Sequence, residues 1–241
     1  MNGVGTFEGR RTHLFSAQIR TKPRQLTEGE FDVEAAKPSP DGGSIAVITN
    51  TEEDADINPV RDIYLASPRG GELRRLTEGR HVISDLSWSP DRKQIAFIGH
   101  DKPKEHAVNL DLWLMPSEGG EKRNLTKKLD RCLGKEMGSD LRVSTPNPGA
   151  VWSHEGRSLY IMTSSIPHCN IYNVDIEGQT VRKVVGDKTV DGFSLSRDNS
   201  VIAFNAMDST HPAELWVKDR EGERSLTDFN EALLSELTLS T

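Results

Sequence analysis

The feature that most constrains this chain is a nine-residue segment that occurs four times. Every copy starts with Ser, and the residues six and eight positions later are apolar in all four copies without any gap. Internal repeats decide the architecture of a chain before weaker signals are weighed. We therefore treat the chain as a repeat protein, with copies Ser39-Pro-Asp-Gly-Gly-Ser-Ile-Ala-Val47, Ser89-Pro-Asp-Arg-Lys-Gln-Ile-Ala-Phe97, Ser153-His-Glu-Gly-Arg-Ser-Leu-Tyr-Ile161 and Ser196-Arg-Asp-Asn-Ser-Val-Ile-Ala-Phe204.

The start of the repeated segment predicts a turn between two strands. In Ser-Pro-Asp-Gly, Pro fixes φ at the second position, Asp can bond its own backbone, and Gly accepts a positive φ. The apolar alternation that follows predicts a strand. A short apolar segment before the turn, such as residues 82–88, predicts another strand.

Two more signatures recur after each copy and predict a third and a fourth strand. The third carries a polar residue, an aliphatic residue and an aromatic one: Asp62-Ile-Tyr64, Asp111-Leu-Trp113, Asn170-Ile-Tyr172, Glu214-Leu-Trp216 and, ahead of the first copy, His13-Leu-Phe15. The fourth ends in Leu-Thr at Thr27, Thr77, Thr126 and Thr227, with Lys183-Val-Val185 as the weakest member. Gly70-Gly71 and Gly119-Gly120 lie between third and fourth strands and predict hairpin turns.

Four antiparallel strands in about 40 to 50 residues, repeated, are typical of a β-propeller blade. We therefore predict an all-β fold, a β-propeller of four-stranded antiparallel blades. A half blade is expected at 12–27 and complete blades at 31–79, 80–128, 142–188 and 189–227. The repeated aromatic residues are expected to pack between blades, with an aromatic ligand cage as the alternative.

Four and a half blades predict an incomplete ring. Residues 228–237 favour a helix, with Asp228 and Glu231 at capping-box spacing, rather than the two missing strands. The simplest interpretation is a piece of a longer propeller, with residues 1–228 as the partial propeller and 229–241 as a linker. Open sheet edges pair readily with other chains, so self-association, and hence a homo-oligomer, is expected.

Composition excludes several classes of function. A net charge of -7 argues against a nucleic-acid groove, which needs clustered Lys and Arg. Because no apolar run reaches the roughly 20 residues of a membrane helix and the N-terminus lacks a secretion signal, we predict no membrane association and a cytoplasmic location. Cys132 and Cys169 have no metal or redox spacing and are predicted to be free thiols.

Few residue patterns in the sequence indicate a metal, catalytic or modification site. His100 and His106 could be metal ligands, but a solvated loop is favoured, as it is for the acidic run Glu52–Asp56, because neither matches a known metal pattern. Asn124-Leu-Thr126 fits a glycosylation triplet but coincides with a Leu-Thr strand. We predict no metal, no cofactor and no catalytic residue. The first strand of each blade lines the central channel in a propeller. We therefore predict an acidic part of this channel that attracts a peptide's amino terminus, from Asp32, Glu34, Asp85 and Asp191, beside Ser84.

The repeated phrases resemble the propeller of TolB-like proteins and of the prolyl oligopeptidase family of serine peptidases. Three segments are similar to its acylaminoacyl-peptidase branch: Asp54-Ala-Asp-Ile-Asn-Pro-Val60, Leu129-Asp-Arg131 with Gly134 and Ser139-Asp-Leu-Arg142, and Leu226-Thr-Asp-Phe-Asn-Glu-Ala-Leu-Leu234. The resemblance runs from Arg11 onward. It implies that an α/β-hydrolase domain follows the propeller and that the catalytic triad lies there.

The resemblance implies a gate: the propeller admits short peptides to the serine and excludes folded proteins. No Gly-x-Ser-x-Gly nucleophile elbow is present in the 241 residues, so the chain alone is expected to be inactive. The expected partners are peptide substrates that pass to the hydrolase domain. Two alternatives remain, a stand-alone TolB-like propeller that binds another protein and a small closed propeller of four or five blades.

Overall fold

The computed structural model describes residues 9–134, 147–177 and 180–238. Regular structure in them is almost entirely β, and the one helix, α1, spans Glu231–Leu234. The chain divides into two compact units, residues 1–108 with 113–124 and residues 109–112 with 125–241. Each unit is described by itself.

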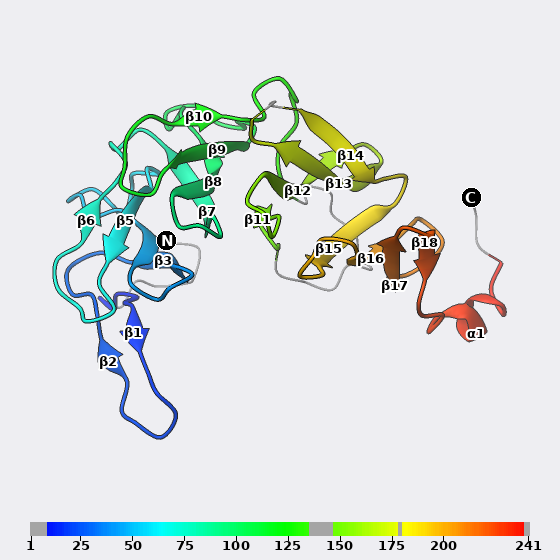
Figure 1. Ribbon diagram of the computed structural model, residues 1–241, viewed down its shortest axis with the longest axis horizontal. Coiled ribbons are helices and arrows are strands. Elements are labelled where there is room, and N and C mark those ends of the chain that lie inside the picture. Colours follow the sequence, from blue (N-terminus) through cyan, green and yellow to red (C-terminus); the bar gives the residue numbers. More distant parts are fainter. Residues whose placement is uncertain (1–8, 135–146, 178–179, 239–241) are drawn as a thin grey trace. The chain divides into compact units, whose positions relative to one another are not determined.

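The first unit contains a short hairpin and two four-stranded sheets, each antiparallel and in chain order (Figure 1). Residues 111 and 112 of β9 group with the second unit. The hairpin pairs β1 (Phe15–Ser16) with β2 (Arg24–Gln25). The sheets consist of β3 (Val33–Pro38), β4 (Ile45–Thr49), β5 (Asp62–Ala66) and β6 (Arg74–Arg75), and of β7 (Val82–Trp88), β8 (Gln94–His100), β9 (Asp111–Pro116) and β10 (Arg123–Asn124).

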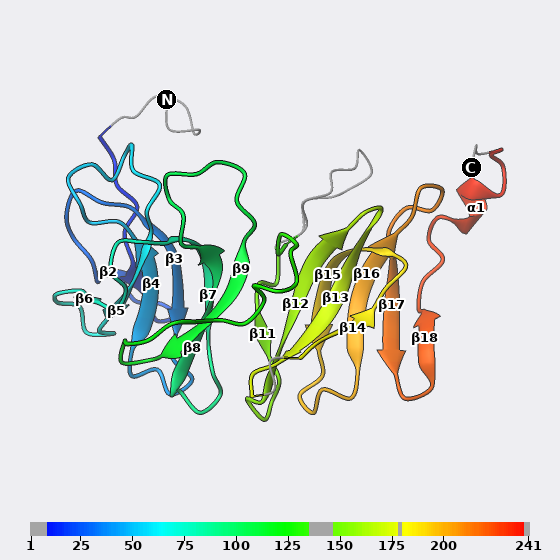
Figure 2. The same cartoon turned by 90° about the horizontal axis from the view of Figure 1, so that it is seen from above.

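The second unit holds one continuous sheet, whose strands β15 to β18 run side by side in Figure 2. Its two antiparallel halves meet at a single parallel pairing of Cys169 in β13 with Thr189 in β15. The strands are β11 (Val151–Trp152), β12 (Ser158–Ser165), β13 (His168–Asp175), β14 (Val181–Val185), β15 (Thr189–Leu195), β16 (Ile202–Met207), β17 (Glu214–Asp219) and β18 (Gly222–Ser225).

The repeated Ser closes the turn between the first and second strands. The Ser39 hydroxyl donates to Asp41 Oδ1 at 2.7 Å and accepts the N–H of Ser44 at 3.0 Å. Ser89 and Ser196 make the same two bonds, and Ser153 accepts the N–H of Ser158 at 3.1 Å. The fourth position of the phrase has a positive φ in all four copies, at Gly42, Arg92, Gly156 and Asn199. The turn was predicted from Pro, Asp and Gly, but the interaction common to all four copies is the backbone N–H bond that the Ser hydroxyl accepts.

The two later signatures meet in a hydrogen-bonded latch between the third and fourth strands. In the sheet β3–β6, the Thr77 hydroxyl donates to Asp62 Oδ1 and accepts the N–H of Ile63 at 3.0 Å. The same arrangement joins Thr126 to Asp111 and Thr227 to Glu214, and Thr27 lies 3.3 Å from His13 Nδ1. The Leu-Thr signature therefore repeats because its hydroxyl pairs with the polar residue across the strand.

Asn170 shows what happens where the latch lacks Thr. Val185 ends the corresponding signature in the sequence but pairs with Ile171, and the Asn170 side-chain oxygen is buried with no hydrogen-bond partner among the described residues. The pairing of β13 with β14 also shifts its register between Ile171 and Tyr172. An unpaired buried polar oxygen costs free energy, so this latch is the weakest of the set.

The repeated aromatic residues pack in the core, as predicted. Tyr64 and Tyr172 are 4% and 8% exposed. Trp113 stacks on Phe97 with ring centroids 6.0 Å apart, and Trp216 stacks on Phe204 at 6.4 Å. Phe15 is the exception, because half of its surface is exposed.

The expected helix over 228–237 is much shorter, and its capping box does not form. The helix covers Glu231–Leu234, and Asn230 is its N-cap residue without a side-chain cap bond. Asn230 instead donates its side-chain amide to Glu214 Oε1 at 2.8 Å, and Asp228 contributes only a backbone carbonyl to the N–H of Glu231. The contact with β17 therefore replaces the predicted cap.

The prediction of an all-β, propeller-type fold built of antiparallel strands is confirmed. Within the described part of the chain, β1 and β2 pair only with each other, and β18 pairs only with β17.

Candidate functional site

The four acids that were predicted to line a channel lie at the first strand of three sheet segments. Asp32 directly precedes β3, Glu34 lies in β3, and Asp85 lies in β7, all in the first unit. Asp191 lies in β15 of the second unit. Their places on first strands agree with the repeat, but the pairs they form were not anticipated from the sequence.

Three of these acids face a cation of their own unit. Asp32 Oδ2 is 3.2 Å from Arg11 Nη1, and Asp32 Oδ1 also accepts the N–H of Thr12 at 2.6 Å. Glu34 forms an ion pair with Arg61. Asp85 Oδ1 is 3.8 Å from Lys37 Nζ. Because each negative charge has a nearby positive one, the first strands of this unit present less net negative charge than their acids suggest.

Burial separates Asp85 and Asp191 from the other two. Burial raises the pKa of Asp85, although Lys37 partly opposes this. Asp191 is 1% exposed. An acid that is buried to this degree offers little surface to an incoming amine, so Asp32 and Glu34 are the more accessible members of the set.

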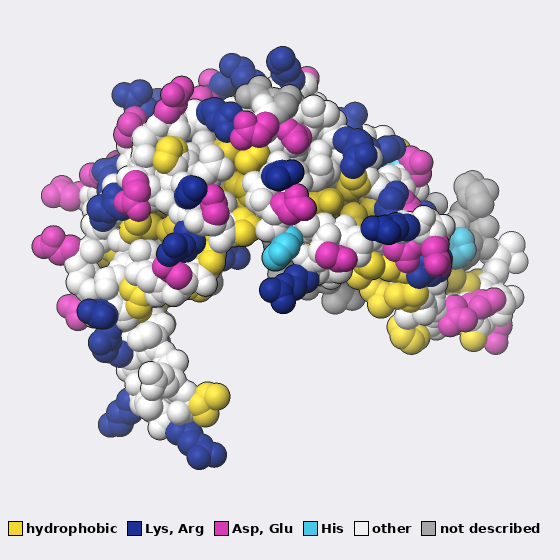
Figure 3. Space-filling model, in the orientation of Figure 1, with side chains coloured by type: hydrophobic (Ala, Val, Ile, Leu, Met, Phe, Trp, Pro, Cys, Tyr) yellow, Lys and Arg dark blue, Asp and Glu magenta, His cyan; other side chains and the backbone are white. Residues whose placement is uncertain are grey.

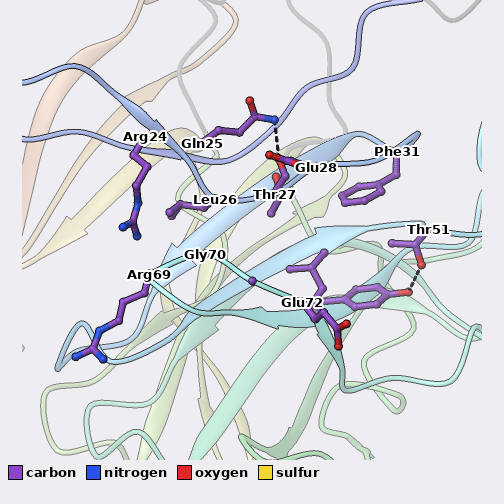
Figure 4. A pocket seen from close by; sticks show the side chains of 13 residues that line it. Arg24, Gln25, Leu26, Thr27, Glu28, Phe31, Thr51, Arg69, Gly70 and Glu72 are labelled. Carbon is purple, nitrogen blue, oxygen red and sulfur yellow. Dashed lines mark hydrogen bonds between the residues drawn. The ribbon is translucent and has the colours of Figure 1, made fainter.

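A hollow of the first unit lies between the β1–β2 hairpin and the β3–β6 sheet (Figure 4). Its volume is about 700 Å³. Leu26, Phe31 and Leu73 supply apolar wall, and the hydroxyls of Thr51 and Tyr64 bond to each other at 2.9 Å. This volume lies within the range of small-molecule sites.

Charged side chains of both signs border this hollow. Arg24 and Arg69 lie on one side of the view in Figure 4, and Glu28 and Glu72 lie toward the other. Arg24 also donates to the carbonyl of Pro68 at 2.9 Å. The lining of this hollow, among the described residues, includes no His, Cys or Ser. The arrangement can bind a polar chain, but it holds no nucleophile with an adjacent base.

A smaller hollow of about 430 Å³ lies in the second unit at the first strands β11 and β15. Trp152, Phe193 and Leu195 contribute apolar surface, and His154 and Arg197 lie at the following turns. His154 donates its backbone N–H to Asn199 Oδ1 at 3.3 Å. The first strands of the second unit therefore also line a hollow, through residues that the sequence analysis did not select.

Asp208, Thr210 and His211 form a cluster that superficially resembles a catalytic triad. Asp208 Oδ1 and the Thr210 hydroxyl lie 2.9 and 3.0 Å from the same His211 nitrogen, Nδ1. A triad instead needs the acid and the nucleophile on opposite ring nitrogens. Burial opposes ionisation of Asp208, but backbone N–H bonds from Thr210 and His211 hold its pKa at about 2. The cluster is therefore a loop-closing turn.

The acidic run Glu52–Asp56 was expected to be a solvated loop, and it is largely exposed but anchored by two arginines. Arg75 Nη1 lies 2.7 Å from Glu52 Oε1, and Arg11 forms two bonds to Asp56 at 2.6 and 3.0 Å. Among residues 9–134, 147–177 and 180–238, no group of three or more His, Cys, Asp or Glu side chains could hold a metal ion. None of the helical residues in that same part could form a span across a membrane.

Arg11 is the functional-looking residue that sequence reasoning missed. It joins Asp32, at the first strand, to Asp56 in the acidic loop, and its side chain is only 12% exposed. Arg11 lies outside every repeated segment, so a search for repeats does not single it out. Arg11 therefore links the segment before β1 to the loop between β4 and β5.

Comparisons with known proteins agree on one architecture. Residues 1–126 match the family described as acylaminoacyl-peptidase, N-terminal β-propeller domain. The uncharacterized peptidase YuxL of Bacillus subtilis (strain 168) is 25% identical over 241 residues, which are 99% of this chain and 37% of YuxL. The chain thus spans little more than a third of that relative.

Two solved structures share the fold. An acylaminoacyl peptidase of Pyrococcus horikoshii superposes with a TM-score of 0.65 at 20% identity, over 90% of this chain and 30% of that one. TolB from Acinetobacter baumannii superposes with a TM-score of 0.59 at 17% identity, over 86% and 46%.

Proposed function

Because this chain belongs to the acylaminoacyl-peptidase N-terminal β-propeller family, we propose that it is the substrate-gating part of an acylaminoacyl or oligopeptide serine peptidase. In this proposal the propeller admits short peptides, and an α/β-hydrolase domain outside these 241 residues carries the Ser-Asp-His triad. The observation that carries the proposal is the match over residues 1–126, which is more than half of the chain.

The chemistry of the described residues supports a role without catalysis. Among the described residues, the first hollow is lined by no His, Cys or Ser, and Ser196 at the second hollow bonds to Asp198 within its own turn rather than to a histidine. The Asp208–His211 cluster has the wrong geometry for a triad. The sequence also lacks a Gly-x-Ser-x-Gly elbow. A gate needs no catalytic group, and Asp32 and Glu34 are the more accessible acidic residues at the first strands of the first unit.

The first test asks where catalysis lies. We expect the 241-residue chain to leave acetyl-alanine p-nitroanilide intact and to escape labelling by a fluorophosphonate probe, which reacts with activated serines. A chain extended by the coding sequence after Thr241 should hydrolyse the substrate and take the label. Labelling of the 241-residue chain itself, or an inactive extended chain without a Gly-x-Ser-x-Gly elbow, would refute the proposal.

The second test asks whether the propeller gates. In the extended chain, short acyl peptides should be cleaved and a folded protein of ordinary size should not. Deleting residues 1–227 should allow cleavage of longer polypeptides if the remaining domain folds, which circular dichroism would check. Equal size selectivity with and without the propeller would contradict gating.

Asp32, Glu34, Asp85 and Asp191 enter this proposal as candidates for attracting a peptide amino terminus. Replacing all four with Asn or Gln should raise KM for peptides with a free amino terminus and leave blocked peptides unchanged. Since three of the four already face a cation, we expect a change of about threefold or less. An identical KM for both peptide classes would remove the acids from the gate.

The competing function is a TolB-like propeller that binds another protein. It predicts that the natural reading frame encodes no hydrolase domain after residue 241. The reading frame therefore separates the two functions before any assay is done.

A further inference from the structure

One position of the repeat carries a different kind of side chain in three of the blades. It lies two residues before the point where the pairing of the first and second strands shifts its register, which follows Val33, Ile83 and Val190. The residues at this position are Phe31, His81 and Lys188. The same place in the fold therefore holds an apolar ring, a titratable ring and a permanent cation.

His81 is buried where the two four-stranded sheets of the first unit meet. It is 5% exposed, and its ring centroid lies 5.7 Å from that of Phe97 in β8 and 5.3 Å from that of Trp113 in β9, nearly perpendicular to both rings. Its backbone carbonyl accepts the N–H of Arg61, the residue before β5, at 2.9 Å. His81 therefore packs within one sheet and is hydrogen-bonded to the other.

The environment of the His81 ring disfavours a second ring proton. Nδ1 is buried and has no hydrogen-bond partner among the described residues. A neutral imidazole can keep one nitrogen free of hydrogen, whereas both nitrogens of an imidazolium are donors. Protonation would therefore bury a charge together with a donor that finds no acceptor, and both cost free energy.

The charged neighbours do not compensate for this cost. Three carboxylates favour the imidazolium and one ammonium opposes it, namely Asp62, Glu78, Asp101 and Lys122. Asp62 already accepts a bond from Arg75 at 3.1 Å, and Glu78 lies 3.9 Å from Lys122. Basic and acidic side chains are interspersed on the face of the first unit that Figure 3 shows. Burial is the largest influence, and it lowers the pKa of His81 below its ordinary 6.5.

Lys188 shows what accompanies a charge at the same position. Its Nζ lies 4.5 Å from the ring centroid of Trp216, the counterpart of Trp113, and 3.7 Å from Glu223 Oε2. The aromatic neighbour is thus common to both positions, but Lys188 also has an acid beside its charge. His81 has the ring and no partner at its buried Nδ1.

We propose that His81 is a pH-sensitive contact between the sheets β3–β6 and β7–β10, which is firm while the imidazole is neutral and loosens when it takes up a proton. The counterparts Phe31 and Lys188 do not change charge between pH 5 and 8. Because the folded-state pKa of His81 lies below that of an unfolded chain, its contribution to stability is complete above pH 6.5. The contribution is lost as the pH falls through the folded-state pKa.

NMR titration of the histidines in the 241-residue chain tests the contact directly. The His81 resonance is identified by its loss in the His81→Phe variant, which introduces the residue type of position 31. Its midpoint should lie below 6.5, and the amide of Arg61 should lose protection from solvent exchange over the same pH range. A midpoint at or above 6.5, or an Arg61 amide that does not respond, would overturn the proposal even if the variant fails to fold.

Urea denaturation at pH 7.5 and at pH 5.0 measures the consequence for stability. A histidine that stays neutral in the fold lowers the folding equilibrium constant by up to about thirtyfold over this range, because an unfolded one is almost fully protonated at pH 5.0. The His81→Phe variant should lack this part of the loss. The His106→Gln variant, which removes an exposed histidine of the same unit, should lose as much as wild type. Equal losses in wild type and His81→Phe are the result that contradicts the proposal.

Discussion

The sheet β3–β6 and the sheet segment β15–β18 carry the same signatures, yet the Leu of the Leu-Thr pair is buried in the first and exposed in the second. Leu76 is 8% exposed in the first, and Leu226 is 54% exposed in the second. Asp62 accepts bonds from Thr77, Arg75 and Gly79, whereas Glu214 binds Thr227 and Asn230 on an accessible edge. The comparison teaches that the repeated residues shape a blade locally, while its stability depends on the neighbour that covers it.

The largest difference between the two regions is expected from truncating the repeated Leu. Leu76→Ala should lower the free energy of unfolding by about 2 to 5 kcal/mol, because it leaves a cavity in a packed core. Leu226→Ala should lower it by about 0.5 kcal/mol or less. Urea denaturation of monomeric protein measures both. Equal losses at the two positions would contradict the difference in cover.

Removing a latch hydroxyl should have the next largest effect. Thr77→Val leaves the N–H of Ile63 without its partner and deprives the buried Asp62 of a donor, so a loss of about 1 to 3 kcal/mol is expected. Thr227→Val, on the accessible edge, should lose less than about 1 kcal/mol. Thr77→Ser retains the hydroxyl and serves as the control. A Ser variant as unstable as the Val variant would mean that packing, and not the latch, matters.

The weakest latch, at Asn170, offers a variant that should gain stability. Val185 pairs with Ile171, the neighbour of Asn170, and the buried side-chain oxygen of Asn170 has no partner among the described residues. If the hydroxyl introduced by Val185→Thr bonds to that oxygen, the variant should be more stable by up to about 1 kcal/mol. The gain should vanish in the background of Asn170→Val. If Val185→Thr instead destabilises by the same amount in both backgrounds, the oxygen does not take the new hydrogen bond.

The smallest effect concerns a feature that the two regions share. A hydrogen bond from Ser39 is the main cause that holds the pKa of Asp41 at about 2, and Ser196 acts in the same way on Asp198. Both folded-state values lie below the ordinary 3.8, so each turn is stabilised above that pH and loses the contribution as the pH falls from 3.8 to about 2. Carboxyl chemical shifts should give the same midpoint for both, and Ser39→Ala should raise that of Asp41 only.

The sequence predicted the fold far better than the site. The four Ser phrases and the recurring aromatics indicated blades because packing imposes the same residue types at each repeat. The pairs of Asp32 with Arg11 and of Glu34 with Arg61 could not be predicted, since each joins residues of different segments and neither cation repeats. The helix at 228–237 was overestimated because Asn230 binds β17, a tertiary contact that capping rules do not include.

The single pairing of Cys169 with Thr189 has a consequence for cooperativity. Through it, β11–β14 and β15–β18 become one hydrogen-bonded sheet, whereas β3–β6 and β7–β10 remain two. Backbone amides of β11–β18 should therefore open to solvent exchange as one unit with a common opening free energy. The sheets β3–β6 and β7–β10 share no strand pairing, so their opening is coupled only through the core cluster that both supply. The chain then melts in fewer steps than it has repeats.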